Sequence, residues 1–369
     1  MRLAVAAYLC IVAAFAFHLY RSPYWNLDML GYMGNAELNE ITDPVKLHHR
    51  VYGELRSSAP REVFDLLTGA PGFQDDGGAK RDRFLNPDHF GQFLPFFAVR
   101  PMYNKLLYWL SRTGIGLIPA VRLVSAGSYA LLGVLVVAWL LPYTRMAPLL
   151  ALIIMLIPHI VLLGRFTGSD GLSVLLGMLS LYLILEREKL GGGLAILMAA
   201  IWFRTDNIAL VVPVLCVLCL QKRIALWMAG VLAIVAVASV LVINRAAGDH
   251  GIAMLYYRNF IGIPKTPNEV IVHFSFAQYA HFFLSGFKHM FVSFVPLFIL
   301  LGLIGLNRRT AALLGIVTAY SVLHYLILPN WVDRFFGIFY LVTAMTAASQ
   351  VQPPRFLNVS AQTSLRASL

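Results

Sequence analysis

Residues 224–243 read IALWMAGVLAIVAVASVLVI, a run of twenty residues without a charged side chain. As an α-helix this run is about 30 Å long, which is the thickness of the hydrocarbon core of a bilayer. The bilayer core offers no water to the backbone, so such a run crosses it as a helix whose backbone groups bond to one another. We therefore expect an integral membrane protein whose spans are helices.

Comparable apolar runs recur through the rest of the chain. Of its 369 residues, 59% are hydrophobic and only 13% are charged, which is far from the composition of soluble globular domains. The other runs lie at 3–20, 118–141, 146–163, 170–186, 191–203, 207–220, 289–306, 310–328 and 335–349. Together they predict an all-α polytopic helical bundle of about ten spans, in which the short run at 191–203 is tilted or broken.

The short loops between the runs indicate the orientation. If the spans simply alternate, one side of the membrane receives an excess of basic loop residues, which is typical of cytoplasmic loops. These residues are Arg2, Arg145, Arg187, Lys189, Lys222, Arg223, Arg308, Arg309 and Arg355. We therefore expect both termini in the cytoplasm. The formal net charge of +11 then reflects topology and contact with anionic membrane lipids, and no nucleic-acid partner is expected.

Two longer polar segments fall on the outer side. Residues 21–98 are predicted to form the first outer, periplasmic loop, with short amphipathic pieces that suit interfacial helices, and residues 244–288 form the second. We expect a single transmembrane module over residues 1–349 and a cytoplasmic tail over residues 350–369. Because the outer loops are long and chemically varied whereas the cytoplasmic loops are short and basic, we expect a functional site on the outer face.

Ionisable residues recur at the chain reversals on this outer side. They are Asp28, Arg100, Arg165, Asp170, Arg204, Asp206, Asp333 and Arg334. Charged side chains are costly in so apolar a chain, and they indicate a functional site by default. The structural alternative is that such side chains reach water from helix ends or pair within a turn, as Arg204 with Asp206 can. His159 and His324, near outer helix ends, are interpreted as packing residues.

Four segments on this side carry a resemblance to a known family. Residues 25–32 (WNLDMLGY) place an aspartate four residues before a tyrosine just after the first span, and residues 97–103 (FAVRPMY) contain an arginine, a proline and a tyrosine. Residues 167–172 (TGSDGL) and 331–336 (WVDRFF) open later helices. In this order and spacing they resemble the GT-C superfamily of polyprenyl-phosphate-sugar-dependent integral membrane glycosyltransferases. The chain departs from members with a paired Asp-Glu in the first loop, because Met29 stands where the glutamate would be.

The resemblance implies a GT-C-like fold and a sugar transfer, with inversion expected, from a polyprenyl-phosphate donor to a glycan, lipid or protein acceptor. Such a transfer needs a base near the acceptor hydroxyl and cations near the departing phosphate, and the planar fork of arginine suits phosphate. We expect Asp28 to be the catalytic base. The expected ligands of the donor phosphate are Arg100, Arg165, Arg204 and Arg334. Supporting or acceptor-binding roles are expected for Tyr32, Tyr103, Asp170, Asp206, Tyr256, Tyr257, Arg258, Lys265 and Asp333.

The expected location is the bacterial cytoplasmic (inner) membrane, with the active site facing the periplasm. No cofactor is expected, and the question of a divalent metal ion stays open. Two alternatives remain at this stage: a flippase or transporter of lipid-linked sugars, and a ligase or polymerase of surface polysaccharide. Transporters hold polar groups near the middle of the membrane, whereas the ionisable residues here cluster at one face. This difference favours an enzyme.

Overall fold

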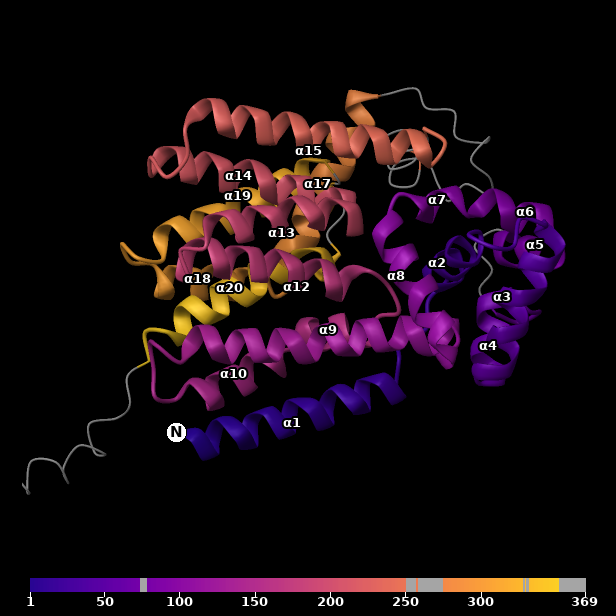
Figure 1. Cartoon of the computed structure of the whole chain (residues 1–369), viewed down its shortest axis with the longest axis horizontal. Helices are drawn as coiled ribbons and strands as arrows, with labels where there is room; N and C mark the ends of the chain where they lie inside the picture. The colour runs from indigo at the N-terminus through magenta and orange to yellow at the C-terminus, as the bar shows by residue number, and fades with distance from the viewer. Residues whose placement is uncertain (74–77, 250–256, 258–274, 328, 330–331, 352–369) are drawn as a thin grey trace, which may run out of the picture.

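The structure is a computed structural model that describes residues 1–73, 78–249, 257, 275–327, 329 and 332–351. In this part the chain consists of α-helices and their links, with an isolated bridge between Tyr24 and Phe166 in place of any β-strand. Figure 1 shows long helices side by side, with a lobe of short helices at one end. For these residues the prediction of an all-helical chain is confirmed.

The helices have the following bounds. The bundle contains α1 (Arg2–Arg21), α9 (Leu117–Leu140), α10 (Ala147–Met155), α11 (Pro158–Arg165), α12 (Asp170–Leu181), α13 (Leu190–Phe203), α14 (Ile208–Leu220), α15 (Leu226–Ala246), α17 (Phe276–Val292), α18 (Val295–Gly305), α19 (Ala311–Ile327) and α20 (Gly337–Ala348). The lobe contains α2 (Asp28–Glu37), α3 (Pro44–Ser58), α4 (Arg61–Thr68), α5 (Ala79–Leu85), α6 (Pro87–Phe93), α7 (Pro95–Ala98) and α8 (Pro101–Leu110). Short π- or 3-10-helical segments are η2 (Ser111–Ile115), η3 (Tyr182–Glu186), η4 (Thr205–Asn207) and η6 (Asp333–Phe336).

Polar caps define the ends of helices in the lobe. The Asp43 carboxylate accepts hydrogen bonds from the backbone N–H groups of Val45 and Lys46, both at 2.9 Å, at the start of α3. Asn86 caps α6 in a similar way, and Gly69 follows α4 in the left-handed conformation (φ 63°). These side chains and this glycine satisfy backbone groups that a helix end leaves free. These caps fix where α3, α4 and α6 begin or end.

Apolar length decides which helices can cross a membrane. Among the described helices, α1, α9 and α15 are long and apolar enough, and the number rises to five if two bent helix pairs each count as one span. Only 17% of the most apolar stretch of α15 is buried, so apolar side chains cover the outer surface of this helix, as lipid contact requires. The structure agrees with a helical membrane protein, and the predicted number of about ten spans is not confirmed.

Two of the predicted spans are bent in the structure. The run at 146–163 divides into α10 and α11, which meet at 67°, since Pro158 lacks the N–H that a continuous helix needs there. The run at 289–306 begins inside α17 and continues as α18 at 69°. The second outer loop was predicted at 244–288, but α17 already begins at Phe276. The predicted loop therefore includes the first part of α17, whose mixture of polar and apolar residues falls below the hydrophobicity of a span. Its place outside the membrane stays a prediction.

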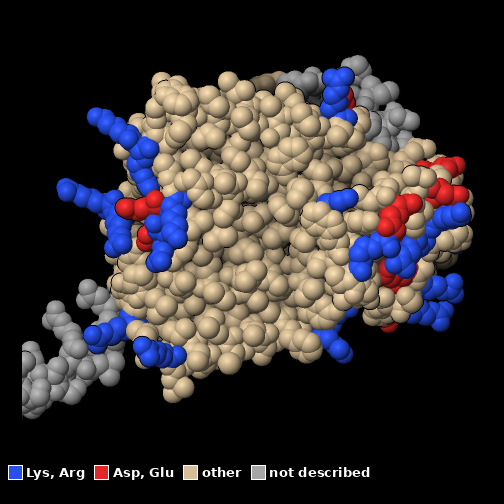
Figure 2. All heavy atoms as spheres, viewed as in Figure 1, with Lys and Arg blue, Asp and Glu red and all other residues tan. Residues whose placement is uncertain are grey.

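Charged side chains lie at the two ends of the bundle. On the face shown in Figure 2, Lys, Arg, Asp and Glu gather at both ends, and the broad middle of the surface carries none. In Figure 1 the N-terminus lies at the end opposite the lobe. We call these the lobe end and the basic end, the latter containing the loops at 141–146, 187–189, 221–225 and 306–310. The arrangement agrees with the alternation of helix directions that the sequence predicts.

Two apolar cores hold the lobe and the bundle together. The larger core fills the bundle, and the smaller one lies under the lobe. Leu117 and Val121, at the start of α9, are fully buried in the smaller core with Leu30 of α2 and Phe97 of α7. Because α9 continues into the bundle, this shared burial positions the lobe against the end of the bundle.

Helices α1 and α9 approach closely at Gly133. The hydroxyl of Tyr8 donates a hydrogen bond to the carbonyl oxygen of Gly133 at 2.8 Å. A Cβ atom at Gly133 would lie only 2.7 Å from a methyl carbon of Val12. Small residues permit such close helix contacts in membrane proteins. The glycine therefore keeps α1 packed against the bundle.

Candidate functional site

The charged residues of the candidate site lie at helix starts or in links between helices at the lobe end. Asp28 and Asp170 are the first residues of α2 and α12. The others follow the same rule: Arg100 precedes α8, Arg204 and Asp206 join α13 to α14, and Arg334 lies in η6 before α20. Helices that alternate in direction bring their reversals to one level, so residues far apart in sequence meet there.

Hydrogen bonds between two links bring the segments of Asp28 and Asp170 together. The backbone N–H of Tyr24 donates to the carbonyl oxygen of Arg165 at 2.7 Å. The side-chain amide of Asn26 donates to the Thr167 hydroxyl at 2.6 Å and to its carbonyl oxygen at 3.2 Å. Asp28 follows Asn26 by two residues, and Asp170 follows Thr167 by three. Asn26 and Thr167 therefore act as local supports of the site.

Arg334 lies between two carboxylates without being closely bound to either. Its guanidinium is 3.8 Å from the Asp28 carboxylate and 3.7 Å from the Asp170 carboxylate. These distances are those of ion pairs and are longer than a hydrogen bond. Burial lowers the pKa of Arg334, while Asp28 nearby raises it. Arg334 is thus held in position by charge, and its guanidinium makes no hydrogen bond to the described residues.

Arg204, in contrast, is tightly engaged. Its Nε donates to both carboxylate oxygens of Asp206, at 2.7 and 2.8 Å, and another of its nitrogens pairs with Asp170. Nε2 of His324 lies 3.2 Å from the Asp206 carboxylate. Burial acts to raise the pKa of Asp206, but Arg204 and then His324 hold it below its usual value. Arg204 therefore works as a clamp that joins the start of α12 to the α13–α14 link.

Aromatic rings lie beneath all three arginines. Arg334 stacks over Phe166 at 3.8 Å, and Arg204 over Phe335 at 4.6 Å. Arg100 lies over the ring of Tyr32 at 5.4 Å. Such rings favour a cation above their faces and fix the plane of a guanidinium. The rings therefore orient the arginines without occupying their N–H groups.

Several buried polar atoms of the site have no hydrogen-bond partner among the described residues. They are Nε of Arg100, Nε of Arg334, the hydroxyl of Tyr103 and the hydroxyl of Ser169. Burial would lower the pKa of Arg100, but Tyr32, Asp206 and Asp28 raise it, so this arginine stays charged. Buried polar groups are normally bonded, and a group left without a partner calls for an explanation. Cationic donors without partners can bind an anion.

The three carboxylates and three arginines of the site balance in charge. Arg204 gives two of its contacts to Asp206 and one to Asp170, whereas Arg334 holds two carboxylates only at long range. An arriving anion therefore finds free N–H groups at Arg334 and Arg100 and would have to displace a close ion pair at Arg204. Of the four predicted phosphate ligands, Arg100 and Arg334 are thus open and Arg204 is closed, and among the described residues Arg165 takes no part in this network of charges.

The remaining predicted site residues differ in their positions. Arg165 is exposed, and its Nε donates to the carbonyl oxygen of Ser22 at 3.0 Å, so it supports the end of α1 and makes no ion pair with the site in the described part of the chain. Tyr32 and Tyr103 are buried and in edge-to-face contact at 4.9 Å, as suits supporting residues. Tyr257 is half-buried. The predictions that fall outside the described residues concern Tyr256, Arg258, Lys265 and the side chain of Asp333.

His324 is the residue that the sequence did not assign to the site. Its ring packs against Phe335 and Phe336 at 5.5 Å, as a packing residue would, and Nε2 also contacts Asp206. His324 lies near the outer end of an apolar run, at the same end of the helices as the charged links. This position was the feature of the sequence that could have assigned it to the site. His159 contacts Phe294 and Tyr340, and its interpretation as a packing residue agrees with these contacts.

The site combines carboxylates with arginines rather than with one another. In the described part of the chain, no three His, Cys, Asp or Glu side chains converge in a way that could hold a metal ion. No protein-family model, curated protein or solved structure matches this chain. The function therefore has to be argued from the residues of the site.

Proposed function

We propose that this chain is a membrane glycosyltransferase of GT-C type, which moves a sugar from a polyprenyl-phosphate donor to a hydroxyl group of a glycan, lipid or protein. One observation carries the proposal. At the lobe end the Asp28 carboxylate lies 3.8 Å from the Arg334 guanidinium, and Arg100 is near enough for Asp28 to raise its pKa. The Nε atoms of both arginines lack hydrogen-bond partners among the described residues. Such a transfer needs a general base and cationic groups that can bind the phosphate, and these residues can supply both.

Asp28 is the best candidate for the base. Its side chain is 20% exposed, against 6% for Asp170, and its recorded partner is the Arg334 guanidinium at 3.8 Å. Asp170 and Asp206 both pair closely with Arg204, and such pairing reduces the basicity of a carboxylate. Asp28 is therefore more accessible to the acceptor hydroxyl than Asp170. The Asp206 side chain is 32% exposed, but its close pairing with Arg204 makes it a weaker base than Asp28.

Arg334 and Arg100 supply the phosphate contacts. Their guanidinium groups are oriented by Phe166 and Tyr32, so little side-chain ordering is needed when the donor binds. In the transfer, Asp28 takes the proton of the acceptor hydroxyl. At the same time the oxygen of that hydroxyl forms a bond to the anomeric carbon of the sugar. The bond from that carbon to the phosphate oxygen breaks, and the arginines stabilise the charge that the departing polyprenyl phosphate gains.

The proposal includes a location. With the basic end in the cytoplasm, about ten helices would cross the bacterial cytoplasmic membrane, several of them bent, and the lobe end would face the periplasm. The lobe end then lies at the level of lipid phosphates in the outer leaflet. A lipid-linked donor could reach Arg334 and Arg100 from within that leaflet.

The test is a transfer assay with the purified full-length protein in lipid nanodiscs. A panel of radiolabelled polyprenyl-phosphate sugars is supplied with membrane extracts as acceptors, and both the released polyprenyl phosphate and the labelled acceptor are measured. Coupled appearance of the two products is expected for one donor. A protein that binds a donor and yields neither product would contradict the proposal and favour a flippase, whereas elongation of a glycan chain would identify a polymerase.

A further inference from the structure

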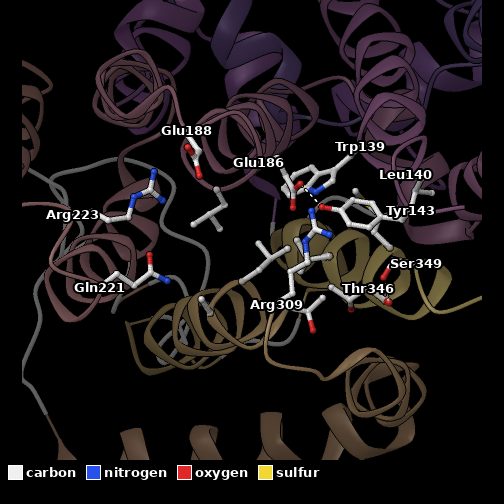
Figure 3. A pocket seen from close by; sticks show the side chains of 16 residues that line it. Trp139, Leu140, Tyr143, Glu186, Glu188, Gln221, Arg223, Arg309, Thr346 and Ser349 are labelled. Atoms are coloured by element: carbon white, nitrogen blue, oxygen red, sulfur yellow. Dashed lines mark hydrogen bonds between the residues drawn. The ribbon is translucent and has the colours of Figure 1, made fainter.

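A cavity of about 320 Å³ lies at the basic end of the bundle, away from the candidate site. Five segments form its walls: the end of α9 with the loop after it, η3 with the residues after it, the α14–α15 link, the start of α19, and α20. Figure 3 shows Tyr143, Glu186 and Arg309 on one side of the cavity and Gln221 and Arg223 on the other. The glycosyltransferase proposal makes no use of this cavity.

Four charged side chains of both signs line the cavity. Arg223 and Arg309 are positive, Glu186 and Glu188 are negative, and no ion pair within 4 Å joins any two of them in the described part of the chain. Contacts with neighbouring residues orient three of these side chains, and the fourth, Glu188, has a left-handed backbone conformation. Arg309 lies over the ring of Tyr143 at 4.3 Å, the Tyr143 hydroxyl donates to Glu186, and Arg223 donates to the carbonyl oxygen of Ile184 at 2.9 Å.

The other walls of the cavity are apolar. Trp139, Leu140, Leu185, Leu313, Val342 and Met345 contribute them. Because these residues belong to the helices of the bundle and the charged ones to the loops or their edges, the cavity changes from polar to apolar toward the membrane. An amphiphilic ligand at headgroup depth matches that change.

The backbone beside the cavity is strained in two places. Glu188 (φ 53°) and Lys222 (φ 55°) adopt the left-handed conformation, although neither is a glycine. Glu188 lines the cavity, and Lys222 lies between the lining residues Gln221 and Arg223. The π-helical segment η3 ends at Glu186 on the same wall. Glu188 and Lys222 both follow helix C-termini, where the left-handed conformation ends the helix: the N–H groups of Lys222 and Arg223 donate to the carbonyl oxygens of Cys219 and Leu218 at 2.9 Å. These helix ends fix the positions of Glu188 and Arg223 in the cavity wall.

We propose that this cavity binds a phosphoethanolamine group, the headgroup of a zwitterionic membrane lipid. Arg223 and Arg309 receive the phosphate, Glu186 and Glu188 receive the primary ammonium, and the apolar walls contact the start of the acyl chains. A headgroup with phosphate alone would leave the two glutamates opposed to it. A quaternary ammonium would match the charge but could donate no hydrogen bond to a carboxylate. The proposal stands independently of the glycosyltransferase activity.

Native mass spectrometry of the full-length protein tests the proposal. The protein in detergent receives equal amounts of phosphatidylethanolamine, phosphatidylglycerol and phosphatidylcholine. Adducts of phosphatidylethanolamine are expected to exceed each of the others by about tenfold, a ratio that one charged hydrogen bond can supply. Arg309→Gln and Glu188→Gln should each remove this preference. Arg145→Gln should keep it, because Arg145 is an exposed arginine of a neighbouring loop and does not line the cavity.

Two further measurements complete the test. Thermal unfolding of each variant should match that of the parent protein, since Arg309 and Glu188 are exposed. Soluble phosphoethanolamine is added as a competitor: displacement of the lipid supports recognition of the free headgroup, and resistance to displacement supports the lipid as the source. Equal adducts of the three lipids in the parent protein, or an unchanged preference in both cavity variants, would overturn the proposal.

Discussion

Replacing Arg334 by lysine keeps the positive charge near Asp28 and Asp170 but removes the planar fork that can donate two parallel hydrogen bonds. The structure records only ion pairs of 3.7 and 3.8 Å for this arginine. Since no close hydrogen bond to either carboxylate is lost, the free energy of unfolding should change little. The affinity for the donor should fall, because the bidentate contact with phosphate is lost.

The magnitude follows from the type of contact. A hydrogen bond to a charged group contributes about 1.5 to 3 kcal/mol, which corresponds to a weakening of the dissociation constant of about 10- to 150-fold. Because Arg334 is 18% exposed, solvent screening should keep the effect nearer the lower value. Arg100→Lys should act in the same direction, since Arg100 lacks a bonded partner at Nε among the described residues.

The assay is direct binding of a polyprenyl-phosphate sugar to each purified variant in detergent, with thermal unfolding measured on the same samples. Arg165→Lys is the matched control: this arginine lies at the same end, is exposed, and bonds to the Ser22 carbonyl oxygen, so its replacement should leave donor affinity unchanged. An unaltered dissociation constant in both Arg334→Lys and Arg100→Lys would refute the assignment of these arginines to the phosphate. An equal loss in the Arg165 control would do the same.

Three other predictions concern the frame of the site. Arg204→Met should lower stability by about 3 to 5 kcal/mol, because Asp170 and Asp206 lose their close partner, and thermal unfolding measures it; a variant as stable as the parent would show that the clamp is dispensable. Gly133→Ala should lower the stability of the protein by about 1 to 3 kcal/mol, because the added Cβ would clash with Val12. Gly127→Ala on the same helix, where a Cβ meets nothing within 4 Å, should not lower it. Equal thermal unfolding midpoints of the two variants would contradict the packing argument. In a variant without native cysteines, Gly53→Cys should react with an impermeant thiol reagent added from the periplasmic side and Gly191→Cys should not. Equal labelling would contradict the predicted orientation, and the opposite pattern would reverse it.

The positions of the long helices could be predicted from the sequence because hydrophobicity over one membrane thickness is a local property. The run at 118–141 became α9 almost unchanged. The bend at Pro158 was not predicted, since a proline in an apolar run can either kink a helix or begin a new one. The start of α17 was missed for a related reason, because its mixture of polar and apolar residues resembles a loop as much as a helix.

The end of the bundle at which the site lies could be predicted from the sequence. Which of its charged residues form ion pairs with one another could be predicted less well. The sequence placed eight charged residues at outer reversals, and the structure brings Asp28, Asp170, Arg204, Asp206 and Arg334 into one network of ion pairs. The sequence could not separate Arg334 from Arg165, since both lie beside apolar helices. Only tertiary contacts distinguish them: Arg165 bonds to Ser22, and Arg334 pairs with the two aspartates of the site. The contact between His324 and Asp206 joins residues 118 positions apart, a distance over which no local pattern carries information.

The Asp28→Asn variant tests the central claim most directly. Asparagine keeps the shape of the side chain and removes its basicity, so sugar transfer should fall by about 10² to 10⁴-fold. Donor affinity should be retained, because Arg334 loses a competing carboxylate and keeps its fork. Asp65→Asn, at a carboxylate of α4 in the lobe that pairs with Arg61 at 3.9 Å, should transfer at the parental rate. A folded Asp28→Asn protein that transfers sugar as fast as the parent would contradict the account, and Asp170 would then be the next carboxylate to replace.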